Sequence, residues 1–242
     1  MAENLPDLVT TAREINQRRW YDIVRTGSLA VFEIIPGLNT ILDEFLPNWK
    51  IERLNAFLID VADSIKKLEG KFNQQESKTV EYGLLLEHVA KQVTQTPSKA
   101  KLNAYRAILL NTCIPSPSNE LERAYFLDFL NRLQEIHIIL LSLFRDQYAF
   151  GKAHSSMPPT NMMTSCLRDT VSSYLKPLSI PDELMQVAIH DLDTMGILPG
   201  LHQSLNTMMT ASGAKELSSR LKDFGRRFAD FIALPREVAS AE

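Results

Sequence analysis

The sequence predicts a mainly α protein, in which an N-terminal helical bundle precedes a small C-terminal winged-helix-like module with a β-hairpin. Three observations support this fold class. Apolar residues recur at helical steps of three and four, glycine is scarce, with 9 in 242 residues, and strand-like alternation is nearly absent before residue 196. We therefore expect a bundle at 1–147, a linker at 148–162, a winged-helix-like module at 163–235 and a disordered tail at 236–242.

The first elements of the bundle are a helix at 6–33, a turn at Pro36-Gly37 and a short apolar helix at 38–46. The surrounding stretch, "GSLAVFEIIPGLNTILDEFLPNW" at 27–49, is the most apolar-looking part of the N-terminal region. A membrane-spanning helix needs about 20 mostly apolar residues, and three acidic residues interrupt this segment. We therefore expect an elbow that packs on the protein's own helices.

A long helix is expected from Asn48, a favourable N-cap, to about Phe72. Its apolar residues alternate at steps of three and four and form a heptad seam. The seam consists of Ile51, Leu54, Leu58, Val61, Ile65, Leu68 and Phe72. Such a stripe needs a partner stripe. We expect a neighbouring helix of the same chain to supply it, with pairing between chains as the alternative.

Three more helices complete the predicted bundle. The first runs over about 76–95, with apolar positions at Val80, Leu84, Leu85, Val89 and Val93. The second begins at Thr96-Pro97 and ends near Cys113. The third covers 120–146 and is apolar nearly all round from Ile136 to Phe144. A helix apolar on every side is typical of the centre of a bundle.

The predicted C-terminal module follows the linker "AFGKAHSSMPPTNM". A helix is expected at about 162–175, and a second one, capped by Ser179, is expected to stop at Gly196. The stretch 201–214, "LHQSLNTMMTASGA", suggests a β-hairpin, and "KELSSRLKDFGRRFADFI" closes the chain as a helix. This order of elements is that of a winged-helix-like module.

Several of these segments resemble a broad group of uncharacterised bacterial helical proteins. They are "IPGLNTILDEFLP", "KIERLNAFLIDVADSIKKLE", "TPSKAKLNAYRAILLN", "FLDFLNRLQEIHIILLSLF", "IHDLDTMGIL" and "LKDFGRRFADFI". The group is loosely similar to abortive-infection proteins, which defend bacteria against phage. The resemblance covers about residues 28–233 and implies the architecture and a role in anti-phage defence. It carries no catalytic residue over to this chain.

Residues with catalytic potential are few and scattered. His137 lies on an otherwise apolar helix, where it is either a general base or ligand beside a carboxylate, or a hydrogen-bonded core residue, which we favour. Consecutive helical residues such as His190 and Asp191 diverge by about 100° and form no dyad. Cys113 is interpreted as a buried structural thiol. The sequence therefore predicts no enzyme, no cofactor and no metal site.

The amino-acid composition restricts which classes of partner and which cell compartment we expect. The formal net charge is −3, without the basic excess that phosphate backbones require. The two cysteines form no CxxC motif, which fits a reducing cytoplasm, and the first residues lack the layout of a signal peptide. We expect a cytoplasmic protein that binds another protein or itself, with no small-molecule substrate.

The last predicted helix carries one candidate binding surface, made of Arg220, Lys222, Arg226 and Arg227. Our interpretation is that phenylalanines of this helix pack inward while its charges face solvent; the alternative is a face that binds a partner or an anion. DNA binding is disfavoured, because the expected recognition helix has no Lys or Arg and carries four carboxylates, which repel phosphates.

The first predicted helix carries the other candidate surface, made of Arg13, Arg18, Arg19, Trp20 and Arg25. Arginines beside an aromatic residue suit a helix at a membrane surface. The leading hypothesis is a non-enzymatic bacterial interaction or scaffold protein, with anti-phage defence as its setting. A membrane-acting effector that uses its N-terminal hairpin is the first alternative, and a DNA-binding regulator is the second.

Overall fold

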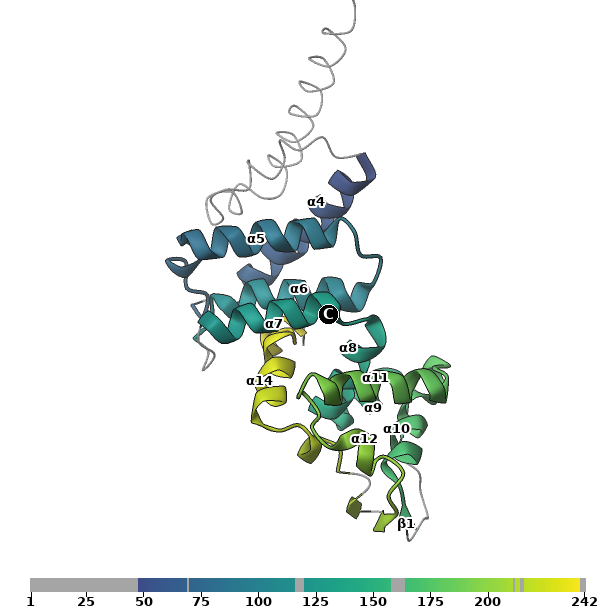
Figure 1. The fold of residues 1–242 in the computed structure, drawn as a ribbon. Helices are drawn as coiled ribbons and strands as arrows, with labels where there is room; N and C mark the ends of the chain where they lie inside the picture. Colours follow the sequence, from purple (N-terminus) through teal and green to yellow (C-terminus); the bar gives the residue numbers. More distant parts are fainter. Residues whose placement is uncertain are drawn as a thin grey trace, which may run out of the picture.

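The computed structural model describes residues 48–68, 70–115, 120–157, 164–210, 212–213 and 216–239. Over these residues the protein is mainly α, as the sequence predicts (Figure 1). Among the described helices, none is long and apolar enough to cross a membrane. The expected helices at 6–33 and 38–46 and the elbow between them lie outside the described residues.

The upper part of Figure 1 is a stack of antiparallel helices: α4 (Asn48–Lys67), α5 (Val80–Val93), α6 (Lys99–Thr112) and α7 (Glu120–Arg132). A short 3-10 turn, η1 (Glu76–Lys78), leads into α5. Leu54, Leu58, Val61, Ile65 and Leu68 are all buried, which confirms the predicted seam. The seam packs against α5 and α6, so its partner is within the chain.

Helix α5 buries a partly different face from the one that the sequence predicts. Val80 and Leu84, which we expected in the core, are exposed, at 74% and 62%. The predicted Val89 and Val93 are buried, together with Tyr82, Leu86 and Ala90, which the prediction did not include. The helix therefore carries two apolar stripes, and packing against α4 and α6 selects the one that contains the large Tyr82 ring.

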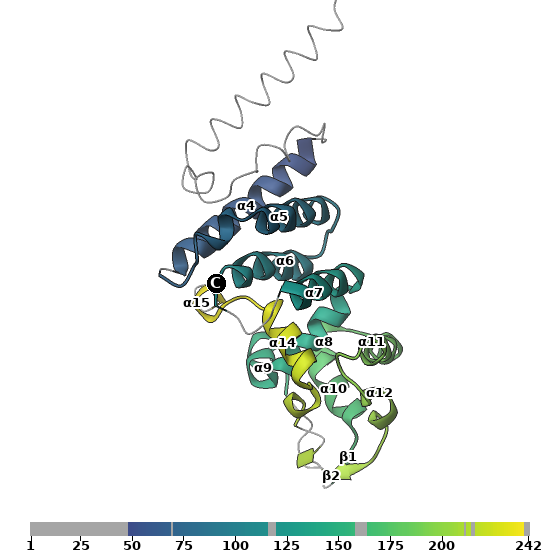
Figure 2. The same ribbon diagram turned by 60° about the vertical axis from the view of Figure 1, so that its left-hand side comes forward.

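The predicted helix at 120–146 is two helices, α7 and α8 (Glu135–Arg145). The chain is extended at Gln134, whose side chain and backbone exchange hydrogen bonds with His137 in a capping box. This polar pair satisfies backbone groups that a continuous helix would satisfy itself. The break lets α8 turn away from α7 and run through the core between the upper and lower halves of the molecule (Figure 2).

The expected linker at 148–162 begins as a helix, α9 (Gln147–His154). Asp146 caps it by accepting the backbone N–H groups of Tyr148 and Ala149, and Phe150 is buried in the core. Small residues suggested a linker, but here they permit close packing: a Cβ on Gly151 would lie 2.8 Å from the Ser156 carbonyl oxygen. Residues 158–162 of the predicted linker lie outside the described residues.

The lower half of the molecule contains α10 (Leu167–Leu175), η2 (Lys176–Leu178), α11 (Asp182–Thr194) and α12 (Leu201–Ser204). The hairpin expected within 201–214 is not formed by the described residues. Strand β2 (Met209–Thr210) pairs antiparallel with β1 (Thr164–Ser165), which precedes α10. The reason is local: the carboxylate of Asp193 binds backbone N–H groups of Gly200 and His202, so the first part of the segment becomes α12.

The C-terminal segment returns to the upper bundle. After η3 (Ser218–Arg220), helix α14 (Asp223–Phe231) packs against α6 and α8, and α15 (Arg236–Ala239) packs against α4 (Figure 2). The expected tail at 236–242 therefore starts as a helix with Val238 buried, and Lys71 pairs with Glu237. One continuous core joins both halves.

Two contacts fix the position of α14. A Cβ on Gly225 would lie 2.1 Å from the carbonyl oxygen of Ile197, so only glycine permits this approach of the two backbones. At the other end, the side-chain amide of Asn111 in α6 donates to the carbonyl oxygens of Phe231 (2.8 Å) and Ala233 (2.9 Å). These carbonyls belong to the end of the helix, where backbone partners are lacking.

Candidate functional site

The candidate residues of the first predicted helix, Arg13, Arg18, Arg19, Trp20 and Arg25, lie outside the described residues. The four of the C-terminal region can be placed. Arg220 is in η3, Lys222 directly precedes α14, and Arg226 and Arg227 lie within α14.

The aromatic side of α14 packs inward, as our interpretation of the sequence expects. Phe126 of α7 is fully buried, and its ring centroid lies 5.2–5.5 Å from those of Phe224, Phe228 and Phe231. Phe129 adds edge-on contacts to two of these rings. Tilted pairs at such distances are favourable beyond simple burial.

The guanidinium groups near α14 are engaged inside the protein. Arg227 binds Glu122 through two nitrogens, at 2.6 and 2.9 Å, and this bond raises the pKa of the Arg227 side chain. Arg226 donates to the backbone oxygens of Ser218 and Leu221. Arg220 donates to the carbonyl oxygen of Gly213 at 3.1 Å, whereas Lys222 is exposed. Three of the four cations therefore have partners within the protein.

His137 is a hydrogen-bonded core residue. Its Nδ1 accepts the backbone N–H of Gln134 at 2.9 Å, and its Nε2 lies 3.3 Å from Oδ2 of Asp191 in α11. Because Nδ1 is an acceptor, the neutral ring carries its proton on Nε2 and donates it to the carboxylate. Both ring nitrogens are thus used in joining α8 to α11, and neither is left to act on a substrate.

Cys113 is a buried thiol, in agreement with the structural interpretation. Burial raises its pKa to about 12, and the nearby charge of Glu76 adds to this effect. The adjacent Tyr82 hydroxyl is also fully buried, and burial together with Cys113 raises its pKa well above the usual value. A thiol that stays protonated at neutral pH is a poor nucleophile.

The acidic residues of α11 also have structural partners. Arg168 binds Asp182 through Nε and Nη2, at 2.8 and 2.6 Å, and Ser172 donates to the same carboxylate. The hydrogen bond from Ser172, followed by the contact with Arg168, lowers the pKa of Asp182. Two further carboxylates of this helix, those of Asp191 and Asp193, bind His137 and the start of α12.

A surface that the sequence analysis missed lies on α5 and α7. Each of these helices presents two apolar residues and then an acid–base pair, at steps of four, three and four. On α5 they are Val80, Leu84, Glu87 and Lys91; on α7 they are Leu121, Tyr125, Asp128 and Arg132. Residues at this spacing share one helix face. We call these eight residues the outer face.

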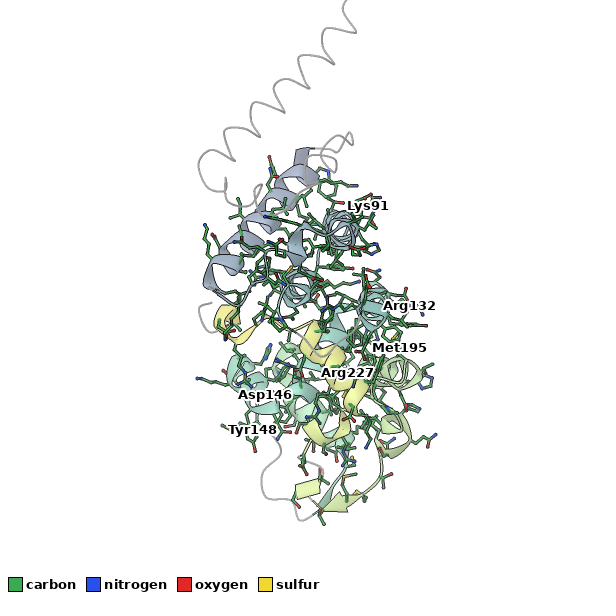
Figure 3. The ribbon with its side chains drawn as sticks, turned by 90° about the vertical axis from the view of Figure 1, so that its left-hand side faces the viewer. Lys91, Arg132, Asp146, Tyr148, Met195 and Arg227 are labelled. Atoms are coloured by element: carbon green, nitrogen blue, oxygen red, sulfur yellow. The ribbon has the colours of Figure 1, made fainter. Side chains whose placement is uncertain are left out.

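The apolar residues of the outer face are exposed. Leu121 and Tyr125 are exposed at 70% and 53%, similar to the apolar residues of α5. Figure 1 shows α6 between α5 and α7, with which it is in contact, and Figure 3 shows Lys91 and Arg132 on one side of the molecule, opposite Tyr148. A hydrogen bond of 2.9 Å between His88 and Asn131 links the two helices.

Hydrogen bonds from α6 also hold the end of α7. The Tyr105 hydroxyl of α6 donates to the side-chain oxygen of Asn131 at 2.9 Å, and Lys101 donates to the Asn131 carbonyl oxygen at 3.2 Å. The charged ends are paired within each helix, Glu87 with Lys91 and Asp128 with Arg132. The outer face is therefore an apolar surface bordered by neutralised charges on a fixed backbone.

A comparison with protein-family models, curated proteins and solved structures found no match for this chain. Among the described residues, no group of three or more His, Cys, Asp or Glu side chains is placed to hold a metal ion. The exposed surface is therefore the basis for inferring a function.

Proposed function

We propose that this protein is an interaction or scaffold protein that docks a partner protein on the outer face of α5 and α7. The observation that carries the proposal is the exposure of four large apolar side chains on two helices that a hydrogen bond joins. Scattered apolar residues are common on protein surfaces, whereas a grouped and bordered set is typical of interaction sites.

The composition of the outer face favours a protein over a nucleic acid. Its acids and bases are equal in number and paired with one another, so it offers no net positive charge to a phosphate backbone. An apolar centre with a polar border, and with a tyrosine among the exposed residues, matches the anatomy of protein–protein interfaces. A partner that presents an apolar helix fits this surface.

The size of the surface sets the expected affinity. Full burial of a leucine or valine side chain contributes about 1.5–3 kcal/mol, and association costs about 4–15 kcal/mol in lost freedom of motion. Four such side chains therefore offset this cost by a small margin. We expect a weak complex with a Kd between about 1 mM and 1 μM, strengthened where the partner also contacts the charged border.

The test is site-specific photo-cross-linking in the cells that produce the protein. A benzophenone amino acid replaces either Tyr125 on the outer face or Tyr148 on α9. The two positions are matched, because both tyrosines are exposed, at 53% and 81%, and they belong to opposite sides of the molecule (Figure 3). We expect a cross-linked product from position 125 that is absent from position 148.

A second substitution shows whether the cross-link depends on the surface. Leu84→Asp places a charge within the apolar centre and should remove the product formed at position 125. Ile59→Asp, at a residue of α4 that is 44% exposed, serves as the control and should preserve it. Equal products from positions 125 and 148, or none from either, would rule out docking at this face.

A further inference from the structure

A pair of histidines lies at the corner between α11 and α12, away from the outer face. The ring centroids of His190 and His202 are 4.6 Å apart, and the ring planes are tilted by 58°. Both residues are exposed. Within the described part of the chain, neither imidazole makes a hydrogen bond to another residue. Their ring nitrogens are therefore accessible from solvent.

The backbone around this pair is fixed by a carboxylate. Asp193 accepts the backbone N–H groups of Gly200 at 2.8 Å and His202 at 3.0 Å, one with each oxygen. Gly196 and Gly200 have φ values of +73° and +77°, which glycine adopts without strain. The corner thus holds two imidazoles from different elements next to each other before any ligand arrives.

We propose that His190 and His202 bind a divalent transition-metal ion of the zinc, nickel or copper class. Neutral imidazole is a preferred ligand for these ions and a poor one for magnesium or calcium. Nitrogens that bind one zinc ion at about 2.0–2.1 Å lie about 3 Å apart in a tetrahedral site. The ring centroids are 4.6 Å apart, so the two side chains start close to the spacing that a shared ion requires.

The remaining coordination positions belong to water. No third His, Cys, Asp or Glu among the described residues completes a ligand group, and both oxygens of Asp193 already accept backbone N–H groups. Asp193 is therefore a positioning residue and not a ligand. The bound ion would join α12 to α11 and stabilise the folded protein, because it binds a pair that exists only after folding.

The other histidines and the two cysteines compete little for the ion. The remaining histidines have ring contacts with Asn131, with Gln134 and Asp191, and with Phe150. Both cysteines are buried. The inference is independent of docking at the outer face, since it concerns other helices and another class of ligand.

The test is calorimetric titration of the untagged full chain with zinc chloride and with nickel chloride, together with thermal unfolding. We expect one ion per chain and a rise in the unfolding midpoint of about 5–10 °C at a hundred times the Kd. Magnesium chloride should give neither effect. Absence of binding, or an equal response to magnesium, would overturn the proposal.

Single substitutions locate the site. His190→Ala and His202→Ala should each lower the affinity at least tenfold, because one imidazole remains in place of a chelating pair. His154→Ala is the matched control, since this ring is half-buried and stacked on Phe150, and it should leave the affinity unchanged. Zinc binding that persists undiminished in both single variants would place the ion elsewhere and contradict the assignment.

Discussion

Helix α14 and the outer face of α5 and α7 differ in how available their side chains are to a partner. In each region, the availability is the opposite of what the residue types suggest. The α14 region has four nearby cations and looked like a binding surface, yet three of them bind Glu122 or backbone oxygens. The four apolar residues of the outer face are all exposed, although two of them, Val80 and Leu84, were predicted to lie in the core. Residue type alone therefore does not show which groups are available to a partner; their neighbours within the fold decide this.

This contrast predicts that substitutions in the two regions have different effects on the free energy of unfolding. Contacts around α14 hold the two halves of the molecule together, so changes there should lower the free energy of unfolding. The apolar residues of the outer face contact little within the described residues, so changes there should leave stability intact and affect binding alone. Four substitutions test this contrast, in order of decreasing effect on stability.

Phe126→Ala should have the largest effect. This ring is fully buried among three phenylalanines of α14, and its removal leaves a cavity at the junction of α7 and α14. We expect a loss of about 3–5 kcal/mol in the free energy of unfolding, measured by urea denaturation. A loss below about 1 kcal/mol would mean that α14 does not pack here.

Gly225→Ala should follow, with a loss of about 2–3 kcal/mol. The added Cβ would lie 2.1 Å from the Ile197 carbonyl oxygen, so the two backbones must separate. Gly83→Ala is the matched control, because the same methyl group on α5 meets no atom within 4 Å. There alanine should stabilise the helix by about 0.5–1 kcal/mol. Similar values for the two variants would contradict the close approach.

Asn111→Ala should cost about 1–2 kcal/mol, because the carbonyl oxygens of Phe231 and Ala233 lose a buried donor. The loss is local, so amide hydrogen exchange should accelerate at the C-terminal end of α14 more than in α6. Unchanged exchange at residues 231–235 would show that the end of α14 is held by other contacts.

Leu84→Ala should have the smallest effect, within about 0.5 kcal/mol. Leu86→Ala, two residues along the same helix, should cost about 2–5 kcal/mol, since Leu86 is 1% exposed and Leu84 is 62% exposed. The substitution and the helix are the same in both variants, so the difference between their stability losses reflects burial and not residue type. Equal losses for both variants would mean that Leu84 is covered in the folded protein.

Part of this fold could be predicted from local patterns. The seam of α4 is buried as its spacing predicts, and α6 ends next to Cys113. The division of 120–146 into two helices was missed, because Gln134 and His137 form their capping box only once the chain turns there. The helical start of the expected linker was missed because small residues favour both flexible segments and close packing, as at Gly151.

The candidate surfaces could also be predicted only in part from the sequence. The order of apolar, acidic and basic residues on the outer face was readable in both helices, at steps of four, three and four. That spacing does not say whether the apolar half faces the core or solvent. The pair of His190 and His202 gave no signal, because a turn fixed by Asp193 separates the two residues.

The sequence by itself determined that this protein is mainly α and where most of the described helices lie, because helix periodicity and capping depend on residues within a few positions of one another. The tertiary structure decided which stripe of α5 is buried, that α14 and α15 return to the first helices, and that most cations near α14 are engaged internally. The stripe of α5 is selected by packing against α4 and α6. The other outcomes depend on contacts between residues about a hundred positions apart, such as Arg227 with Glu122 and Asn111 with Phe231, and no local pattern encodes them.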